Sequence, residues 1–142
     1  MSDFLAQFNG YFSGLKQWQE WDQLRQQLWQ SEQPWFVYFV GEAVPEQPLS
    51  IDELRHFLAE IDKLLRQDHQ EEYLGIVYVD HRPTPSFIKI YDPNHLGSSC
   101  GSRGLKILPG WVLSHTPPID LRASFPNPGG RRRWWQGLFS RA

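Results

Sequence analysis

The sequence predicts an α+β domain with a mostly antiparallel sheet of about four strands, packed by one long capped helix and preceded by N-terminal helices. An amphipathic stretch with a capping signal begins at Ser50. Short runs of β-branched and aromatic residues lie on both sides of that stretch. Two of these runs are joined by a connection too short for a crossover helix, which favours an antiparallel hairpin. No nucleotide-binding fingerprint supports a doubly wound parallel sheet.

Residues 1–33 are predicted to form a helical N-terminal segment. Apolar residues recur at three- and four-residue steps from Phe4 to Leu28, the period of an amphipathic helix. Gly10 and Gly14 interrupt this pattern. We therefore expect a short helix, a bend near Ser13-Gly14 and a longer helix that ends before Pro34. Its tryptophan-rich face is interpreted as core packing rather than as a partner surface.

Residues 35–40, WFVYFV, predict a strand between Pro34 and Gly41. The run is apolar on both faces, which indicates a central position in the sheet. Ser50 and Glu53 then form an S-x-x-E capping box at the start of the clearest helix in the chain. Its apolar stripe consists of Ile51, Leu54, Phe57, Leu58, Ile61, Leu64 and Leu65.

Residues 73–79 and 86–91 predict two strands of a hairpin, and residues 105–108 and 111–115 predict one or two further segments. Pro109-Gly110 between the last two indicates an edge strand or a bulge. Residues 1–122 are thus expected to form a single domain, followed by a linker at 123–130 and a basic aromatic tail at 131–142. The start of the tail has the pattern of a short amphipathic helix.

The length and charge of the chain limit the classes of function that the sequence supports. The 142 residues suffice for one domain with its own core. A net charge of −2 argues against a nucleic-acid binder. The tail contains four of the 14 basic residues and none of the 16 acidic ones, so residues 1–130 carry −6 and the tail +4. The single cysteine and the absence of a signal-peptide pattern at the N-terminus predict a cytoplasmic, bacterial-type protein.

The connection at residues 92–106 concentrates reactive and ligand-capable groups on a Gly/Ser-rich backbone. One hypothesis makes Cys100 a nucleophile, with His95 as base and Asp92 as orienter, in a hydrolase or transferase. No catalytic cysteine signature is matched, and a lone cysteine is more often an inert packing residue. The sequence therefore leaves enzymatic activity open and favours a non-enzymatic role.

A second hypothesis makes the same connection an anion site. Glycine-rich backbone can present converging N–H groups, and two basic side chains add positive charge. No Walker A loop is present. A plain connecting loop is the alternative, although a connection of this length between strands favours use in binding. The predicted ligand-binding residues are Gly97, Ser98, Ser99, Gly101, Ser102, Arg103, Gly104 and Lys106.

A metal site is the third and weakest hypothesis. His81, His95, His115, Asp80, Asp92 and Cys100 are residue types that bind metals. No pair among them has the spacing of a zinc site. We therefore predict no metal and no cofactor, and we interpret His115 as a hydrogen-bonded residue at the end of a strand.

The tail combines basic and aromatic residues in a way that suits the surface of an anionic membrane or an acidic partner. Its apolar face is only about one and a half turns long, so membrane contact through it alone would be weak. This hypothesis places the protein at the inner face of the membrane. The predicted contact residues are Arg131, Arg132, Arg133, Trp134, Trp135, Leu138 and Phe139.

The run YDPNHLGSSCGS, followed by LPGWVLS and PPIDL, resembles a block found in small uncharacterised bacterial proteins of unknown function. The resemblance covers about residues 35–121 and implies no particular activity. From the residues themselves we predict a small binding or interaction domain for a protein partner or a small anionic ligand, with its site at residues 92–106.

Overall fold

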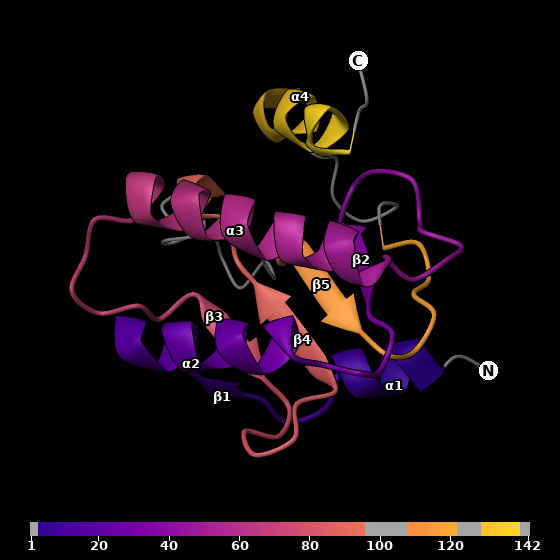
Figure 1. The fold of residues 1–142 in the computed structure, drawn as a ribbon, viewed down its shortest axis with the longest axis horizontal. Helices are drawn as coiled ribbons and strands as arrows, with labels where there is room; N and C mark the ends of the chain where they lie inside the picture. The colour runs from indigo at the N-terminus through magenta and orange to yellow at the C-terminus, as the bar shows by residue number, and fades with distance from the viewer. Residues whose placement is uncertain (1–2, 96–107, 122–128, 140–142) are drawn as a thin grey trace, which may run out of the picture.

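The computed structural model describes residues 3–95, 108–121 and 129–139. They form an α+β fold (Figure 1). Its elements are α1 (Asp3–Phe8), β1 (Ser13–Gly14), α2 (Trp18–Trp29), β2 (Phe36–Phe39), α3 (Ile51–Asp68), β3 (Val77–Val79), β4 (Phe87–Ile90), the 3₁₀ turn η1 (Pro93–His95), β5 (Trp111–Ser114) and α4 (Gly129–Leu138).

The sheet has five strands in the order β1-β3-β4-β5-β2, and every neighbouring pair is antiparallel. The predicted antiparallel sheet and its hairpin of β3 and β4 are therefore confirmed, with one strand more than about four. That strand is β1, which pairs Ser13 with Val79 and Gly14 with Tyr78. The bend predicted at Ser13-Gly14 is thus a short extended segment at the edge of the sheet.

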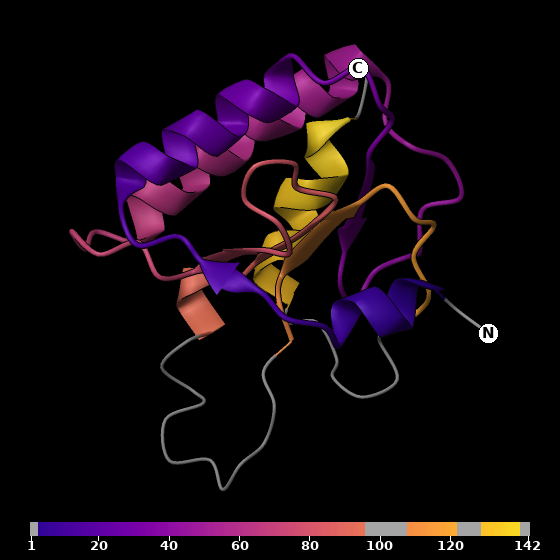
Figure 2. The ribbon, with the colours of Figure 1, turned by 90° about the horizontal axis from the view of Figure 1, so that it is seen from below.

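The two faces of the sheet are covered by different elements. On one face α3 lies between α2 and α4, and together they close the main core (Figures 1 and 2). Phe57, Leu58, Ile61 and Leu65 of α3 are completely buried there. Each such side chain stabilises the fold by roughly 1.5–3 kcal/mol through its burial. On the other face α1 supplies Phe4 to a smaller core.

The capping box predicted for α3 is present. Ser50 Oγ accepts a hydrogen bond from the N–H of Glu53 at 3.1 Å, and the N–H of Ser50 donates to Glu53 Oε1 at 3.0 Å. The interpretation of the α2 tryptophans as core is confirmed for Trp21, which is buried. Trp29, at the last position of α2, is instead exposed.

The central position predicted for residues 35–40 is wrong, because β2 is the last strand in the sheet order. Its apolar pattern has another cause. Val37 and Phe39 belong to the main core and Tyr38 to the smaller one, so both faces are covered. The segment after β2 returns beside the residue before this strand, where the N–H of Leu49 donates to Trp35 O at 3.0 Å.

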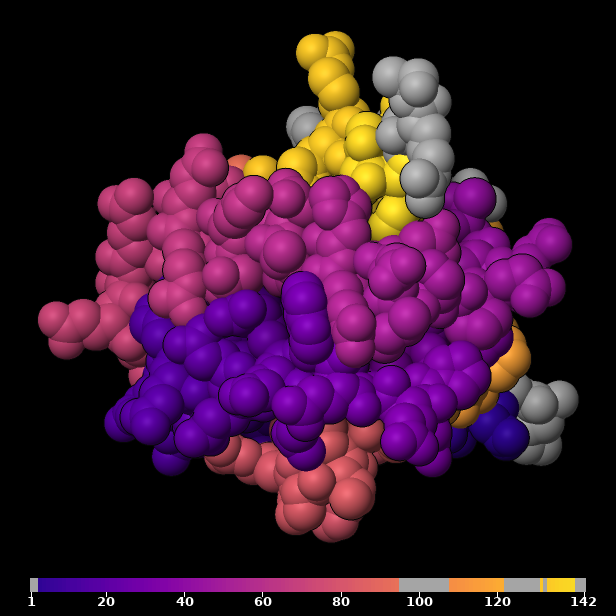
Figure 3. Space-filling model, in the orientation of Figure 1, coloured from indigo at the N-terminus to yellow at the C-terminus, as the bar shows by residue number. Residues whose placement is uncertain are grey.

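The C-terminal helix packs on the domain instead of standing apart from it. Helix α4 lies against α3 (Figure 3), and Leu138 is part of the main core. The helical tail predicted from residue 131 is confirmed and begins at Gly129. The predicted linker lies mostly outside the described residues, as does the strand predicted at 105–108 except for Leu108, which is not in a strand.

Gly75 occupies a backbone conformation that other residues rarely adopt, with φ of +65°. A Cβ added there would lie 2.3 Å from Cε2 of Tyr73. We expect Gly75→Ala to lower the free energy of unfolding by about 1–2 kcal/mol, mainly through the left-handed backbone. Urea denaturation measures this.

Gly137→Ala is the matched control, because it lies within α4 and an added Cβ would meet nothing within 4 Å. Alanine there should leave stability unchanged or raise it by up to about 1 kcal/mol. Equal destabilisation by both substitutions would contradict the assignment of backbone strain to Gly75.

Candidate functional site

The predicted binding connection leaves the sheet through Asp92, just after β4. Asp92 is 2% exposed, and its Oδ1 accepts a hydrogen bond from the N–H of Asn94 at 2.9 Å. This is the Asx turn expected of an Asp-Pro-Asn sequence. The carboxylate therefore sets the backbone direction at the start of η1, at the base of the connection.

The same carboxylate binds the guanidinium of Arg131 in α4. Arg131 Nε lies 2.9 Å from Asp92 Oδ2, and Nη2 lies 3.2 Å from Oδ1. Nη2 also donates to Asp68 Oδ2 at the end of α3. Burial disfavours the charged guanidinium, but the hydrogen bonds to Asp92 and Asp68 outweigh it and raise the pKa of Arg131. One cation thus joins α3, α4 and the base of the connection.

The catalytic hypothesis involves residues that the structure describes only in part. Cys100 lies outside the described residues, and His95 is placed by its backbone in η1. Asp92 is described, and it bonds Arg131 and the Asn94 amide. The proposed Cys100–His95–Asp92 arrangement stays a prediction. All the predicted ligand-binding residues, Gly97, Ser98, Ser99, Gly101, Ser102, Arg103, Gly104 and Lys106, also lie outside the described part.

The apolar members of the predicted tail contact set pack against the body of the protein. Leu138 is 8% exposed. The rings of Trp134 and Trp111 form an edge-to-face pair with centroids 5.6 Å apart. The ring centroids of Trp135 and Phe39 are 5.4 Å apart. Of the other predicted contact residues, Phe139 packs partly buried against the main core, Arg131 forms the ion pairs above and Arg133 is exposed. Contact of these aromatic rings with a membrane would require α4 to leave the body.

Three of the residues considered as metal ligands, His115, Asp80 and Asp92, have structural partners. His115 Nδ1 lies 2.7 Å from Pro34 O, and its ring packs on Trp35 with centroids 3.9 Å apart. The interpretation of His115 as a hydrogen-bonded boundary residue is therefore confirmed. Asp80 accepts from the N–H groups of Ser86 and Phe87 in the hairpin turn. Within residues 3–95, 108–121 and 129–139, no group of three His, Cys, Asp or Glu side chains could hold a metal ion.

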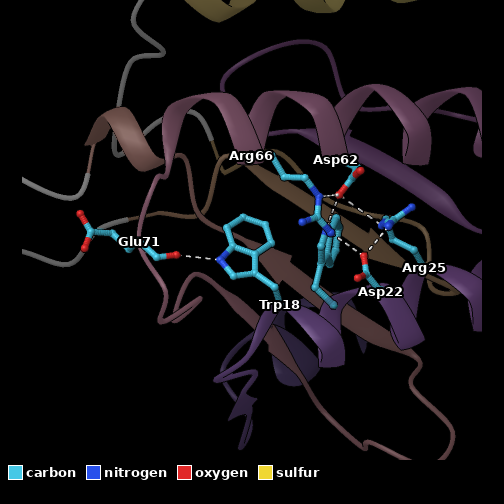
Figure 4. Close-up of polar contacts among 7 residues, drawn as sticks. Trp18, Asp22, Arg25, Asp62, Arg66 and Glu71 are labelled. Carbon is cyan, nitrogen blue, oxygen red and sulfur yellow. Dashed lines mark hydrogen bonds and ion pairs between the residues drawn. The ribbon is translucent and has the colours of Figure 1, made fainter.

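A polar network between α2 and α3 was missed by sequence reasoning (Figure 4). Asp62 of α3 accepts hydrogen bonds from Trp21 Nε1 and from Arg66 Nε, both at 2.8 Å. Asp22 of α2 binds both Arg66 and Arg25, at 2.6 and 2.5 Å. Two acids and two arginines thus balance one another between the helices. The sequence signal was the spacing of each acid and arginine by three or four residues, which places each pair on one helix face.

Aromatic rings complete this network. The guanidinium of Arg66 lies over the ring of Trp18, 4.8 Å from its centroid, and Trp18 Nε1 donates to Glu71 O at 2.7 Å (Figure 4). The ring face of Trp18 is therefore occupied by Arg66, and its N–H by the carbonyl of Glu71. The network stabilises the packing of α2 on α3 and offers no free charge to a ligand.

Glu20 has the largest pKa shift among the described acids. Hydrogen bonds from Arg82 and from the N–H groups of Gln17 and Lys16 lower the pKa of Glu20 from 4.5 to about 2. Because the folded pKa is depressed, the stabilisation is complete above pH 4.5 and is lost as the pH falls toward 2. The stability difference between wild type and Glu20→Gln should therefore shrink across this range in urea titrations.

Glu32→Gln is the control, because Glu32 is exposed and no contact of its side chain is described. Its difference from wild type should change little between pH 4.5 and 2. A Glu20→Gln difference that stayed constant over the same range would contradict the assigned ion pair with Arg82.

No helix within the described ranges is long and apolar enough to cross a membrane. Comparison of the chain with protein-family models, with curated proteins and with solved structures gave no match. The resemblance of residues 35–121 to small bacterial proteins therefore stays a prediction. Function has to be argued from the chain's own residues and their geometry.

Proposed function

We propose that the chain is a small, non-enzymatic binding domain whose ligand or partner site is the connection at residues 92–106. The observation that carries this proposal is the length of the connection. Strands β4 and β5 are direct neighbours, with Ile90 opposite Trp111, yet residues 91–110 lie between them. A hairpin of this kind needs only two to five residues, and a connection longer than about 12–15 residues is uncommon and often functional.

Both ends of the connection are held by contacts with the folded body. At one end the buried Asp92 is bonded to Arg131. At the other end the N–H of Gly110 donates to Ile90 O at 2.8 Å, and Gly110 O accepts from the N–H of Val40 at 2.9 Å. Binding residues are typically carried by connections that a rigid scaffold positions in this way.

The composition of the connection favours an anionic ligand or an acidic partner surface. Residues 93–107 contain two permanent cations, Arg103 and Lys106, and no acid. The one acid at the base, Asp92, is buried and paired with Arg131. Glycine and serine residues between these points can supply backbone N–H and hydroxyl donors to an oxyanion.

The first test reverses the two charges. Inorganic phosphate should shift the NMR signals of the Gly97, Gly101 and Gly104 amides in the wild-type protein. Arg103→Glu/Lys106→Glu should weaken this binding at least about tenfold, since each charge-assisted hydrogen bond contributes roughly 1.5–3 kcal/mol. The dissociation constant from the titration measures the effect.

Lys16→Glu/Lys63→Glu is the control, because it makes the same change in net charge at two exposed lysines. It should leave phosphate binding nearly unchanged. Wild-type glycine signals that do not respond to phosphate, or equal losses in both double variants, would refute the proposed anion site.

The second test separates this proposal from the alternative cysteine-dependent hydrolase or transferase. As a residue of a binding connection, Cys100 should react with iodoacetamide at a rate that rises with pH through about 8.5, the ordinary thiol pKa. His95→Ala should not alter that profile. A reaction already at its plateau near neutral pH, and lost in His95→Ala, would instead favour Cys100 as a nucleophile activated by His95.

A further inference from the structure

Helix α4 combines a basic sequence with aromatic side chains that pack on the body. It is basic, with Arg131, Arg132 and Arg133 in sequence and no acid anywhere in residues 129–142. It also carries adjacent tryptophans, Trp134 and Trp135, on the side that contacts α3 and the sheet. From these features we infer that α4 is a releasable latch, which is docked on the body at rest and binds the surface of an anionic lipid bilayer when released.

The docked and released states use the same apolar side chains. Trp134 packs on Trp111, Trp135 packs on Phe39 and Phe57, and Leu138 is buried. A bilayer interface would take up the same rings and the same leucine, because tryptophan is favoured at the level of the lipid headgroups. Docking on the body and binding to a bilayer therefore exclude each other.

The polar part of the latch is the Arg131 site. Asp68 and Asp92 present two carboxylates to one guanidinium, and the side chain of Arg131 is 16% exposed. Lipid phosphates and carboxylates offer the same kind of acceptor to Arg131. Release leaves two carboxylates without their cation, one of them the buried Asp92, and this cost holds the helix on the body at rest.

The charge distribution of the chain favours an anionic bilayer as the surface that released α4 binds. Residues 1–130 carry a net charge of −6 and residues 131–142 carry +4. An anionic surface attracts the helix and repels the remainder of the chain, whereas a neutral bilayer does neither. The paired tryptophans favour a bilayer over an acidic protein groove, because each indole places an apolar ring and a polar N–H at the interface.

The test weakens the latch on the body and leaves α4 unchanged. In Asp68→Asn/Asp92→Asn, co-sedimentation with vesicles of equal parts phosphatidylserine and phosphatidylcholine should show binding at least about tenfold tighter than wild type. This is the size expected when docking loses one charged hydrogen bond. Adding Trp134→Ser/Trp135→Ser to this variant should remove the gain in vesicle affinity. Vesicles of pure phosphatidylcholine should bind neither the wild type nor Asp68→Asn/Asp92→Asn.

The control is a second double variant that also removes two negative charges, but away from the Arg131 site. Glu32→Gln/Glu46→Gln neutralises two exposed acids for which no side-chain contact is described, so its binding to vesicles should stay close to that of wild type. Equal gains in both double variants would show a non-specific charge effect and would overturn the proposal.

Trypsin measures release without lipid. Cleavage after Arg131, Arg132 and Arg133 should become at least about tenfold faster in Asp68→Asn/Asp92→Asn than in the control, since release exposes these bonds. Unchanged cleavage would overturn the latch. Faster cleavage without tighter vesicle binding would overturn the bilayer as occupant and favour an acidic protein groove. Circular dichroism reports whether the double variant is folded. If it is not, the single variant Asp68→Asn should still show faster cleavage and tighter vesicle binding than wild type.

Discussion

The packing of α3 on the sheet is the constraint on which the other contacts depend. Phe57, Leu58, Ile61 and Leu65 are fully buried, and they contribute the central part of the main core. Helix α2 packs along one side of α3 and α4 along the other (Figure 1). Because both neighbours rest on α3, the polar network around Asp62 and the ion pair of Asp68 with Arg131 exist only when this helix is in place.

The two polar clusters on α3 serve different purposes. The α2–α3 network pairs two acids with two arginines and is closed by tryptophan rings, so it has no charge left over. The Arg131 site instead holds two carboxylates against one guanidinium and joins three separate parts of the chain. Through Asp92 and Arg131, the second cluster links the proposed binding connection with the C-terminal helix.

The position of Asp92 also bears on the choice between the hypotheses for residues 92–106. Its carboxylate is bonded to the side chain of Arg131 and to the backbone of Asn94. In this position it shapes the base of the connection and neutralises a cation. That role fits a binding connection supported by a rigid scaffold. The catalytic role predicted for Asp92 would add to this structural one.

The sequence by itself determined the elements whose signals are local. The capping box and apolar stripe of α3, the hairpin of β3 and β4 and the helical pattern of the tail are contained in short windows, so periodicity and capping residues predicted them. Only the tertiary structure decided the edge position of β2, the pairing of β1 with β3 and the contact between Arg131 and Asp92, 39 residues apart. These depend on which distant segments pack together, and an apolar run such as WFVYFV has the same pattern in a central strand and in a covered edge strand.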